Sequence, residues 1–263
     1  MKITFIGLGN MASAMIKGIL AHDIVDKEDI VGADPSCEAR EKIEKVFGIR
    51  TVENNRMVYD ADVVILAVKP QIAEVVLSEI KDNLSDQAII LSIMAGKTLA
   101  WIEGKLTDSV KIVRAMPNTP AFVGEAISGV CRNDFVTDAE MEKCLRLLHS
   151  FGKAEEIPEG LMDAVIGVSG SAPAYVFLFI EALADAGVLK GMHRGQAYRF
   201  AAQAVLGSAK MVLETGKHPG ELKDMVCSPG GTTIEAVKVL EEKGFRDAVI
   251  AAATKAAEKA KEL

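Results

Sequence analysis

The segment "IGLGNMASA" (Ile6–Ala14) decides the fold of the first part of the chain. It follows a short apolar run and contains the pattern Gly7-x-Gly9-x-x-Ala12. Gly7 permits a tight turn, Gly9 lets the backbone approach a pyrophosphate, and Ala12 is small enough for close helix–strand packing. A helix that begins near Asn10 would offer its amides to the phosphates. We therefore predict a dinucleotide site here, the alternative being a strand–helix turn that needs glycine for steric reasons alone.

Short apolar runs alternate with helical patterns along the first half of the chain. Continuous apolar runs are typical of buried parallel strands, and their alternation with helices favours βαβ units and a Rossmann-type, doubly wound α/β sheet. The predicted strands are Lys2–Ile6, Asp29–Ala33, Asp62–Val68, Ala88–Ile93, Val110–Met116, Ala126–Arg132 and Gly152–Ile157. The predicted helices are Asn10–Ala21, Cys37–Val46, Gln71–Lys81, Thr98–Gly104 and Thr137–Ser150.

From about Gly160 onward the pattern contains no good strand, so we predict an all-helical second domain. Its first helix is apolar nearly all round and is expected to be buried, in part against a second subunit. We place the domains at residues 1–155 and 156–263. The predicted helices of the second domain are Ala174–Gly191, Gly195–Gly216, Thr232–Gly244 and Phe245–Leu263.

Composition argues against several classes of partner. The net charge is -7 and no long basic run appears, so neither nucleic acid nor an anionic membrane is expected. No apolar stretch nears about 20 uninterrupted residues, and no secretory signal pattern opens the chain. The four cysteines are dispersed without metal-ligand spacing, which predicts reduced thiols, a cytoplasmic protein and no metal site.

The end of the second predicted strand bears on the choice of nucleotide. Asp34 lies where an acid usually binds the adenosine ribose, which favours NADH. Ser36 and Arg40 follow it, and these side chains would suit the 2′-phosphate of NADPH. Asp34 is equally well explained as a turn residue before Pro35. Local chemistry leaves the nucleotide open.

Further candidates lie at the ends of the predicted strands Asp62–Val68 and Ala88–Ile93, because ligands of open parallel sheets bind at the carboxyl ends of strands. Lys69 in "AVKP" would meet phosphate or ribose, unless Pro70 simply ends the strand there. Met94 and Ala95 in "SIMAG" would lie near the nicotinamide. The loop Arg114–Ala126 either lines the cleft or is a structural crossover.

The sequence offers no clear catalytic base. None of the four histidines lies in a cleft-facing motif, and each is better explained as a surface or capping residue. A nicotinamide enzyme without a base suits an imine or iminium substrate, which needs only hydride and positioning.

A second glycine-rich loop, "CSPGGTT" (Cys227–Thr233), precedes a predicted helix. Gly230 and Gly231 would let a substrate carboxylate approach the free amides, while Thr232 or Thr233 would cap the helix and also donate a hydrogen bond. The alternative is a plain N-cap loop.

These motifs together resemble the pyrroline-5-carboxylate reductase family. The resemblance is carried by "PGELKDMVCSPGGTTIEAVKVLE" (Pro219–Glu241), "SGSAPAYVF" (Ser169–Phe177), "MPNTP" (Met116–Pro120), "AVKP" and "FIGLGNM", and it covers the full chain. It implies reduction of 1-pyrroline-5-carboxylate to L-proline, the last step of proline biosynthesis. It also implies a preference for NADPH with NADH accepted, a homodimer through the helical domain that can assemble into decamers, and an active site at the subunit interface.

The resemblance also implies site residues. Thr233 would be the catalytic residue, donating a hydrogen bond toward the ring nitrogen. The substrate positions are Ser228, Gly230, Gly231, Thr232 and Thr233. The cofactor positions are Ile6, Gly7, Leu8, Gly9, Asn10, Met11, Asn54, Ala67, Val68, Lys69, Pro70, Ile93, Met94 and Ala95, to which local chemistry adds Asp34.

Two other functions compete with this one. A β-hydroxyacid dehydrogenase-like reductase of another small carboxylate should carry a lysine or other base on the first cleft-facing helix of its second domain. That helix has no lysine before Lys190, at its far end. A nucleotide-sensing regulatory protein would not need the carboxylate pocket that "SPGGTT" predicts.

Overall fold

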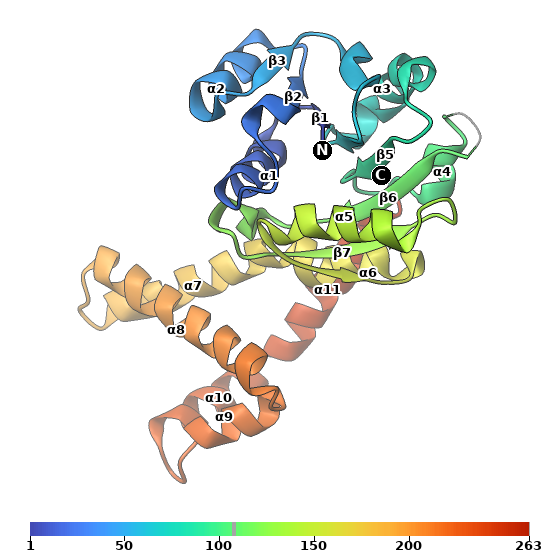
Figure 1. Cartoon of the computed structure of the whole chain (residues 1–263). Helices are drawn as coiled ribbons and strands as arrows, with labels where there is room; N and C mark the ends of the chain where they lie inside the picture. Colours follow the sequence, from blue (N-terminus) through green and yellow to red (C-terminus); the bar gives the residue numbers. More distant parts are fainter. Residues whose placement is uncertain (107–108, 263) are drawn as a thin grey trace. The chain divides into compact units, whose positions relative to one another are not determined.

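A computed structural model describes residues 1–106 and 109–262 of the chain. Eight strands of the described residues form one sheet in the order β3-β2-β1-β4-β5-β6-β7-β8 (Figure 1). Only β6 and β7 are antiparallel to each other among the paired strands. The strands are β1 (Ile3–Ile6), β2 (Ile30–Ala33), β3 (Arg50–Val52), β4 (Val63–Leu66), β5 (Ile89–Ser92), β6 (Lys111–Met116), β7 (Ala126–Arg132) and β8 (Gly152–Glu156).

The order of the strands confirms the doubly wound fold. From β1 the chain builds outward through β2 to β3, and it then returns to the other side of β1 for β4, β5 and β6. The strand order therefore reverses between β1 and β4, whose carboxyl ends are Ile6 and Leu66. A crevice at such a point is where open α/β sheets bind their ligands.

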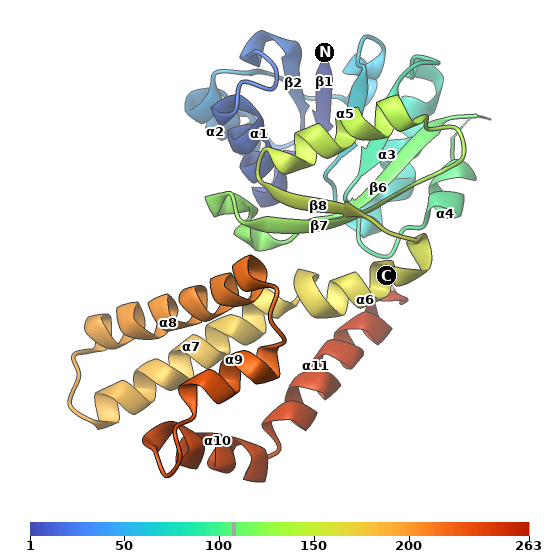
Figure 2. The ribbon, with the colours of Figure 1, turned by 60° about the horizontal axis from the view of Figure 1, so that its bottom comes forward.

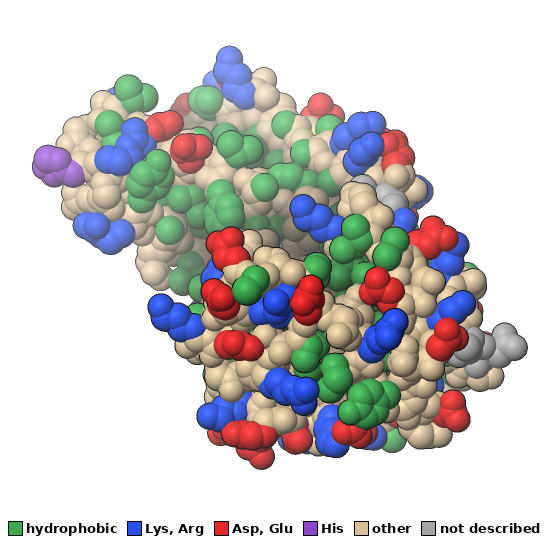
Figure 3. Space-filling model, turned by 90° about the horizontal axis from the view of Figure 1, so that it is seen from above, with side chains coloured by type: hydrophobic (Ala, Val, Ile, Leu, Met, Phe, Trp, Pro, Cys, Tyr) green, Lys and Arg blue, Asp and Glu red, His purple; other side chains and the backbone are tan. Residues whose placement is uncertain are grey.

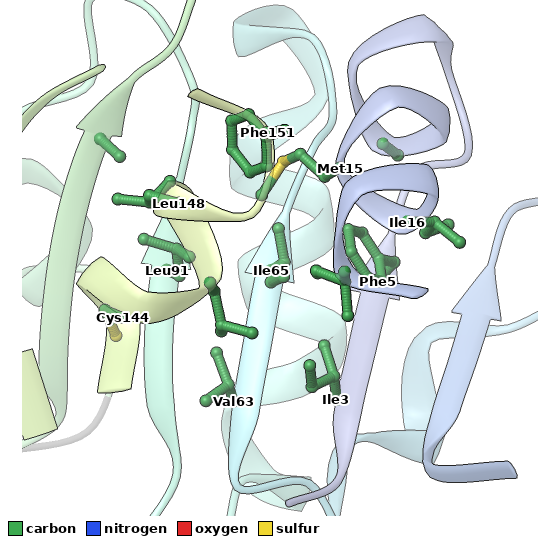
Figure 4. Packing of buried hydrophobic residues seen from close by; sticks show 14 of the residues in the cluster. Ile3, Phe5, Met15, Ile16, Val63, Ile65, Leu91, Cys144, Leu148 and Phe151 are labelled. Atoms are coloured by element: carbon green, nitrogen blue, oxygen red, sulfur yellow. The ribbon is translucent and has the colours of Figure 1, made fainter. Parts of the chain in front are cut away.

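Helices cover both faces of the sheet. One face packs against α1 (Asn10–Ala21), α2 (Cys37–Phe47) and α5 (Asp138–His149). The other packs against α3 (Ala73–Ile80), α4 (Leu99–Glu103) and Met162 of the short α6 (Met162–Val165). Figure 4 shows the first of these cores, with Ile3, Phe5, Met15, Ile16, Val63, Ile65, Leu91, Cys144, Leu148 and Phe151 labelled.

Two elements differ from the sequence prediction. The strand β3 was not predicted because it has only three residues, Arg50–Val52, and none of them is fully buried. The helix α9 (Pro219–Val226) was also missed, although it has a clear start: Pro219 occupies its first turn and the His218 ring accepts a hydrogen bond from the Gly220 amide. The predicted helix end at Leu263 lies outside the described residues.

All four cysteines are free thiols. Cys131 and Cys144 are buried, and burial raises the pKa of each thiol to about 12. Both thiols are therefore protonated and unreactive at neutral pH.

The chain divides into two compact units. One comprises residues 1–171 together with the C-terminal segment from Lys255, and the other is Ala172–Thr254. The sequence placed the domain boundary between residues 155 and 156, where β8 ends. That boundary stays a prediction.

The second unit is helical throughout its regular structure. Its elements are α7 (Ala172–Leu189), α8 (Arg194–Thr215), α9, α10 (Thr232–Glu242) and the first part of α11 (Phe245–Ala260). The helices α7 and α8 lie side by side as an antiparallel pair (Figure 2).

The prediction that the first helix of this unit is buried is wrong for the single chain. Large apolar side chains of α7 are exposed, among them Phe177 at 63% and Leu178 at 66%. Figure 3 shows hydrophobic side chains gathered on the surface of this unit. Exposed apolar patches of this kind mark surfaces that bind something.

Length and composition alone would allow one helical run to cross a membrane. Among the described residues, the run Glu159–Leu189 has 31 residues and contains an 18-residue window with a mean hydropathy of 1.6, whereas no such span was expected from the sequence. These two properties do not distinguish a membrane span from a helix that packs against other protein.

Candidate functional site

The first glycine-rich loop has the geometry of a phosphate cradle. Gly7 has a φ of +89°, and a Cβ built on it would lie 2.7 Å from the Ala67 carbonyl oxygen. Only glycine therefore fits at this point, where the chain leaves β1 beside the end of β4. Gly9 is the N-cap of α1, and a Cβ built on it would have no atom within 4 Å. No side chain caps α1, so its first amides face the open space beside Gly9. These residues fit a pyrophosphate.

Asp34 braces this loop. Its Oδ2 accepts a hydrogen bond from the Leu8 amide at 2.8 Å, and its Oδ1 accepts one from the Ser36 amide at 2.8 Å. The second bond makes Asp34 a turn residue, which is one of the two roles that the sequence left open. Its binding of a ribose stays a prediction.

A cavity of about 700 Å³ opens at the carboxyl ends of β1 and β2. It brings together five of the predicted cofactor residues, which come from four separate segments of the chain: Ile6, Gly7, Asp34, Asn54 and Val68. The cavity thus lies beside the strand-order reversal, as the fold requires of a dinucleotide site.

Six other predicted cofactor residues follow β4 and β5, outside the lining of that cavity. Ala67, Lys69 and Pro70 follow β4, and Ile93, Met94 and Ala95 follow β5, which pairs with β4. The Met94 side chain is 1% exposed and belongs to the hydrophobic core, so only its backbone can face a ligand. Leu8 is likewise buried.

The second glycine-rich loop lies in the helical unit and is built as tightly as the first. Gly230 has a φ of +66°, and the Gly231 amide donates to the Ser228 carbonyl at 3.0 Å. A Cβ on Gly231 would lie 2.3 Å from the Ser228 Oγ, so a larger residue there requires the Ser228 side chain to rotate away. Gly231, which has no side-chain cap bond, is the N-cap of α10. Neither Thr232 nor Thr233 therefore caps the helix.

Two of the motifs that carry the family resemblance, "MPNTP" and "SGSAPAYVF", meet in the first unit. The buried Asn118 of "MPNTP" donates from Nδ2 to the Ser169 carbonyl at 3.1 Å, and its Oδ1 accepts from the Ile127 amide at 3.1 Å. Ser169 belongs to a π-helical turn, Ile166–Gly170, directly before α7. Such turns occur frequently at functional sites.

The outer wall of the cavity consists of residues that were not predicted from the sequence. These residues are Pro35, Glu53, Asn55, Arg56, Ile72, Val75, Val76 and Glu79. Three residues of this wall, Glu53, Asn55 and Arg56, follow the unpredicted strand β3. Had β3 been recognised, the rule that ligands bind at carboxyl ends would have pointed to the loop after it.

Comparisons with known proteins agree on one family. A family model described as "Pyrroline-5-carboxylate reductase dimerisation" matches residues 159–263, and one described as "NADP oxidoreductase coenzyme F420-dependent" matches residues 2–96. The chain is 53% identical to the pyrroline-5-carboxylate reductase of Escherichia coli (strain K12), over 100% of this chain and 98% of that protein.

Solved structures give the same result. A pyrroline-5-carboxylate reductase from Coxiella burnetii superposes with a TM-score of 0.91 at 36% identity, covering 99% of this chain and 97% of that one. The pyrroline carboxylate reductase of Plasmodium falciparum, solved with NADP bound, has a TM-score of 0.90 at 35% identity and the same coverage.

Two glycine substitutions separate the steric and the binding roles of the first loop. We expect Gly7→Ala to lower the free energy of unfolding by about 2 kcal/mol or more, because a Cβ clashes with Ala67 and the φ is positive. Gly9→Ala has room for its Cβ and should unfold like the wild type, yet bind NADPH at least about tenfold more weakly. Thermal unfolding and calorimetric titration check both. Wild-type NADPH affinity in Gly9→Ala would show that the loop does not hold the pyrophosphate.

Proposed function

The chain belongs to the pyrroline-5-carboxylate reductase family, and from this premise we propose that it reduces the C=N bond of 1-pyrroline-5-carboxylate to give L-proline, the last step of proline biosynthesis. The observation that carries the proposal is the full-length identity of 53% to a reductase of that name. The two glycine-rich loops support it, because one suits a dinucleotide and the other a small carboxylate.

A nicotinamide cofactor supplies the hydride when it is bound. Gly7, Gly9 and the first amides of α1 hold its pyrophosphate, and the cavity beside Asp34 and Asn54 holds its adenosine half. Residues after β4 and β5 orient the nicotinamide. We propose NADPH as the preferred form with NADH also accepted, a preference that the NADP-bound relative supports.

The substrate carboxylate binds at the start of α10. The amides of Thr232 and Thr233 are free of a side-chain cap, and Ser228, Gly230 and Gly231 bring the backbone close to a ligand. A helix N-terminus favours a negative charge because its amides and its dipole both point at the anion. Holding the carboxylate fixes which face of the ring receives hydride.

Thr233 acts next to the reacting bond. The ring nitrogen gains electron density as C5 accepts hydride, so a hydroxyl that donates a hydrogen bond to this nitrogen stabilises the transition state. A threonine hydroxyl has too high a pKa to be a strong acid. Its role is therefore to position the ring, directly or through a water that delivers the proton.

The exposed apolar face of α7 suits a second copy of the chain. The match to a reductase dimerisation model over residues 159–263 supports oligomerisation, and we propose a homodimer through the helical unit that can assemble into decamers. An apolar groove of about 510 Å³ between α7 and α8, lined by Phe177, Leu178 and Tyr198 among others, would receive side chains of the partner. The free thiols suit the reducing cytoplasm, where we propose that the enzyme works.

A spectrophotometric assay tests the reaction. With 1-pyrroline-5-carboxylate, we expect the purified chain to oxidise NADPH, followed at 340 nm as about one NADPH per proline formed. With a 3-hydroxy acid and NADP⁺, we expect no reduction of the nucleotide. Turnover of the hydroxy acid alone would favour a β-hydroxyacid dehydrogenase, and nucleotide binding without any turnover would favour a sensor.

Substitution of Thr233 tests the hydrogen bond. Thr233→Ala should lower kcat/KM about tenfold, since one hydrogen bond to developing charge is lost, with most of the change in kcat. Thr233→Ser keeps the hydroxyl and should stay within about threefold of the wild type. Wild-type turnover in Thr233→Ala would exclude this role for the hydroxyl.

Sedimentation tests the assembly. The wild type should sediment as a dimer or as a multiple of dimers at micromolar concentration. Leu178→Asp places a charge in the exposed face of α7 and should shift the chain toward monomer. Val46→Asp, on the exposed side of α2, is the matched control and should leave the assembly intact. A monomeric wild type would contradict the dimer.

A further inference from the structure

The cavity at the ends of β1 and β2 has one apolar wall and one polar wall. Val68, Ile72, Val75 and Val76 form an apolar side that suits a flat aromatic base. The polar side is made by carboxylates, amides and a single cation. Its residues are Asp34, Glu53, Asn54, Asn55, Arg56 and Glu79.

Arg56 is the only Lys or Arg among the described residues that line this cavity. Its backbone is fixed, because its amide donates to the Asn54 Oδ1 at 3.1 Å and it lies inside the 3-10 turn Asn55–Val58. Its side chain is exposed at the cavity, and none of the described hydrogen bonds or ion pairs involves its guanidinium. Arg56 is thus a cation at the rim of a nucleotide cavity.

The carboxylates of the cavity are largely engaged elsewhere. Both oxygens of Asp34 accept backbone amides, and Glu79 accepts the Asn55 Nδ2 at 2.6 Å. Glu53 is exposed on the side of the loop that leads to Arg56. A ligand that neutralises Arg56 in this acidic surrounding must bring its own negative charge.

The guanidinium of Arg40, the other cation near the predicted ribose position, is held by one nitrogen against backbone carbonyls. Arg40 does not line the cavity, and its Nη1 donates to the carbonyl oxygens of Asp34 at 2.7 Å and Pro35 at 3.0 Å. Ser36 likewise caps α2 by accepting the Ala39 amide at 3.2 Å. The two residues that the sequence suggested for a 2′-phosphate therefore both have structural tasks, whereas Arg56 has none.

We propose that Arg56 is the residue that selects NADPH over NADH, pairing its guanidinium with the 2′-phosphate of the adenosine ribose; this rests on the proposed use of a nicotinamide cofactor. A guanidinium presents two parallel donors that match phosphate oxygens, and it stays charged at all working pH values. NADH lacks this phosphate and gains nothing from Arg56. Cofactor preference is then decided by the loop after β3 rather than by Asp34.

The experiment compares two small ligands that differ only in the 2′-phosphate. Calorimetric titration of the full-length protein with 2′,5′-ADP and with 5′-AMP gives a ratio of affinities that isolates the contribution of this phosphate. In Arg56→Gln we expect the ratio to fall about 10- to 100-fold, the range for loss of a charge-assisted hydrogen-bonded pair. Arg56→Lys keeps the charge without the two parallel donors and should give an intermediate ratio.

A matched control guards against a general effect of charge. Arg146→Gln removes an exposed arginine from α5, outside the cavity, and should leave the ratio at its wild-type value. In steady-state assays the ratio of kcat/KM for NADPH to that for NADH should fall in Arg56→Gln by a factor similar to that seen in the titrations.

An unchanged affinity ratio in Arg56→Gln would overturn the proposal, whether both ligands bind as before or both weaken equally. Equal weakening would mean that Arg56 stacks on the adenine or only supports the cavity. The titrations need no turnover, so they decide this point even if the chain fails to reduce 1-pyrroline-5-carboxylate.

Discussion

One close approach between two backbones governs the nucleotide half of this protein. Gly7 leaves β1 with a positive φ directly against the Ala67 carbonyl at the end of β4, where a side chain would collide. The approach is possible because β1 and β4 are neighbouring parallel strands whose ends coincide. After that contact the chain turns into α1. The contact therefore sets the positions of the free helix amides, the Leu8–Asp34 hydrogen bond and the cavity beside them.

The helical unit depends on a different constraint. Its longest helices carry more apolar surface than one chain can bury, as the exposure of Phe177 and Leu178 shows. The sequence pattern of α7 is that of a buried helix, whereas its environment in a single chain is not. The second copy that we propose would resolve this conflict, because burial of these side chains would then contribute to association instead of to folding alone. The start of α10, where we propose that the substrate carboxylate binds, lies in this same unit.

Much of the fold was readable from local pattern. The strands β1, β2, β4, β5 and β6 appear as apolar runs because both faces of a central parallel strand are covered, and α1 was predicted at its observed bounds. The edge strand β3 left no such run, since Arg50 is exposed and the strand is short. Missing it concealed the loop that carries Asn54, Asn55 and Arg56, which forms the outer wall of the cavity.

By itself the sequence determined the doubly wound sheet, the two glycine-rich loops and the family to which the chain belongs, because each of these rests on residue types at short, fixed spacings. Only the tertiary structure decided what the polar side chains around the nucleotide do. From the sequence alone, three polar residues were candidate nucleotide ligands: Asp34, Ser36 and Arg40. In the folded chain, their side chains form hydrogen bonds with backbone groups instead. Arg56 belongs to no motif identified in the sequence. It lines the cavity because the strand before it, β3, pairs with β2. Hydrogen-bond partners are a property of three-dimensional proximity, and sequence spacing does not specify them across separate strands.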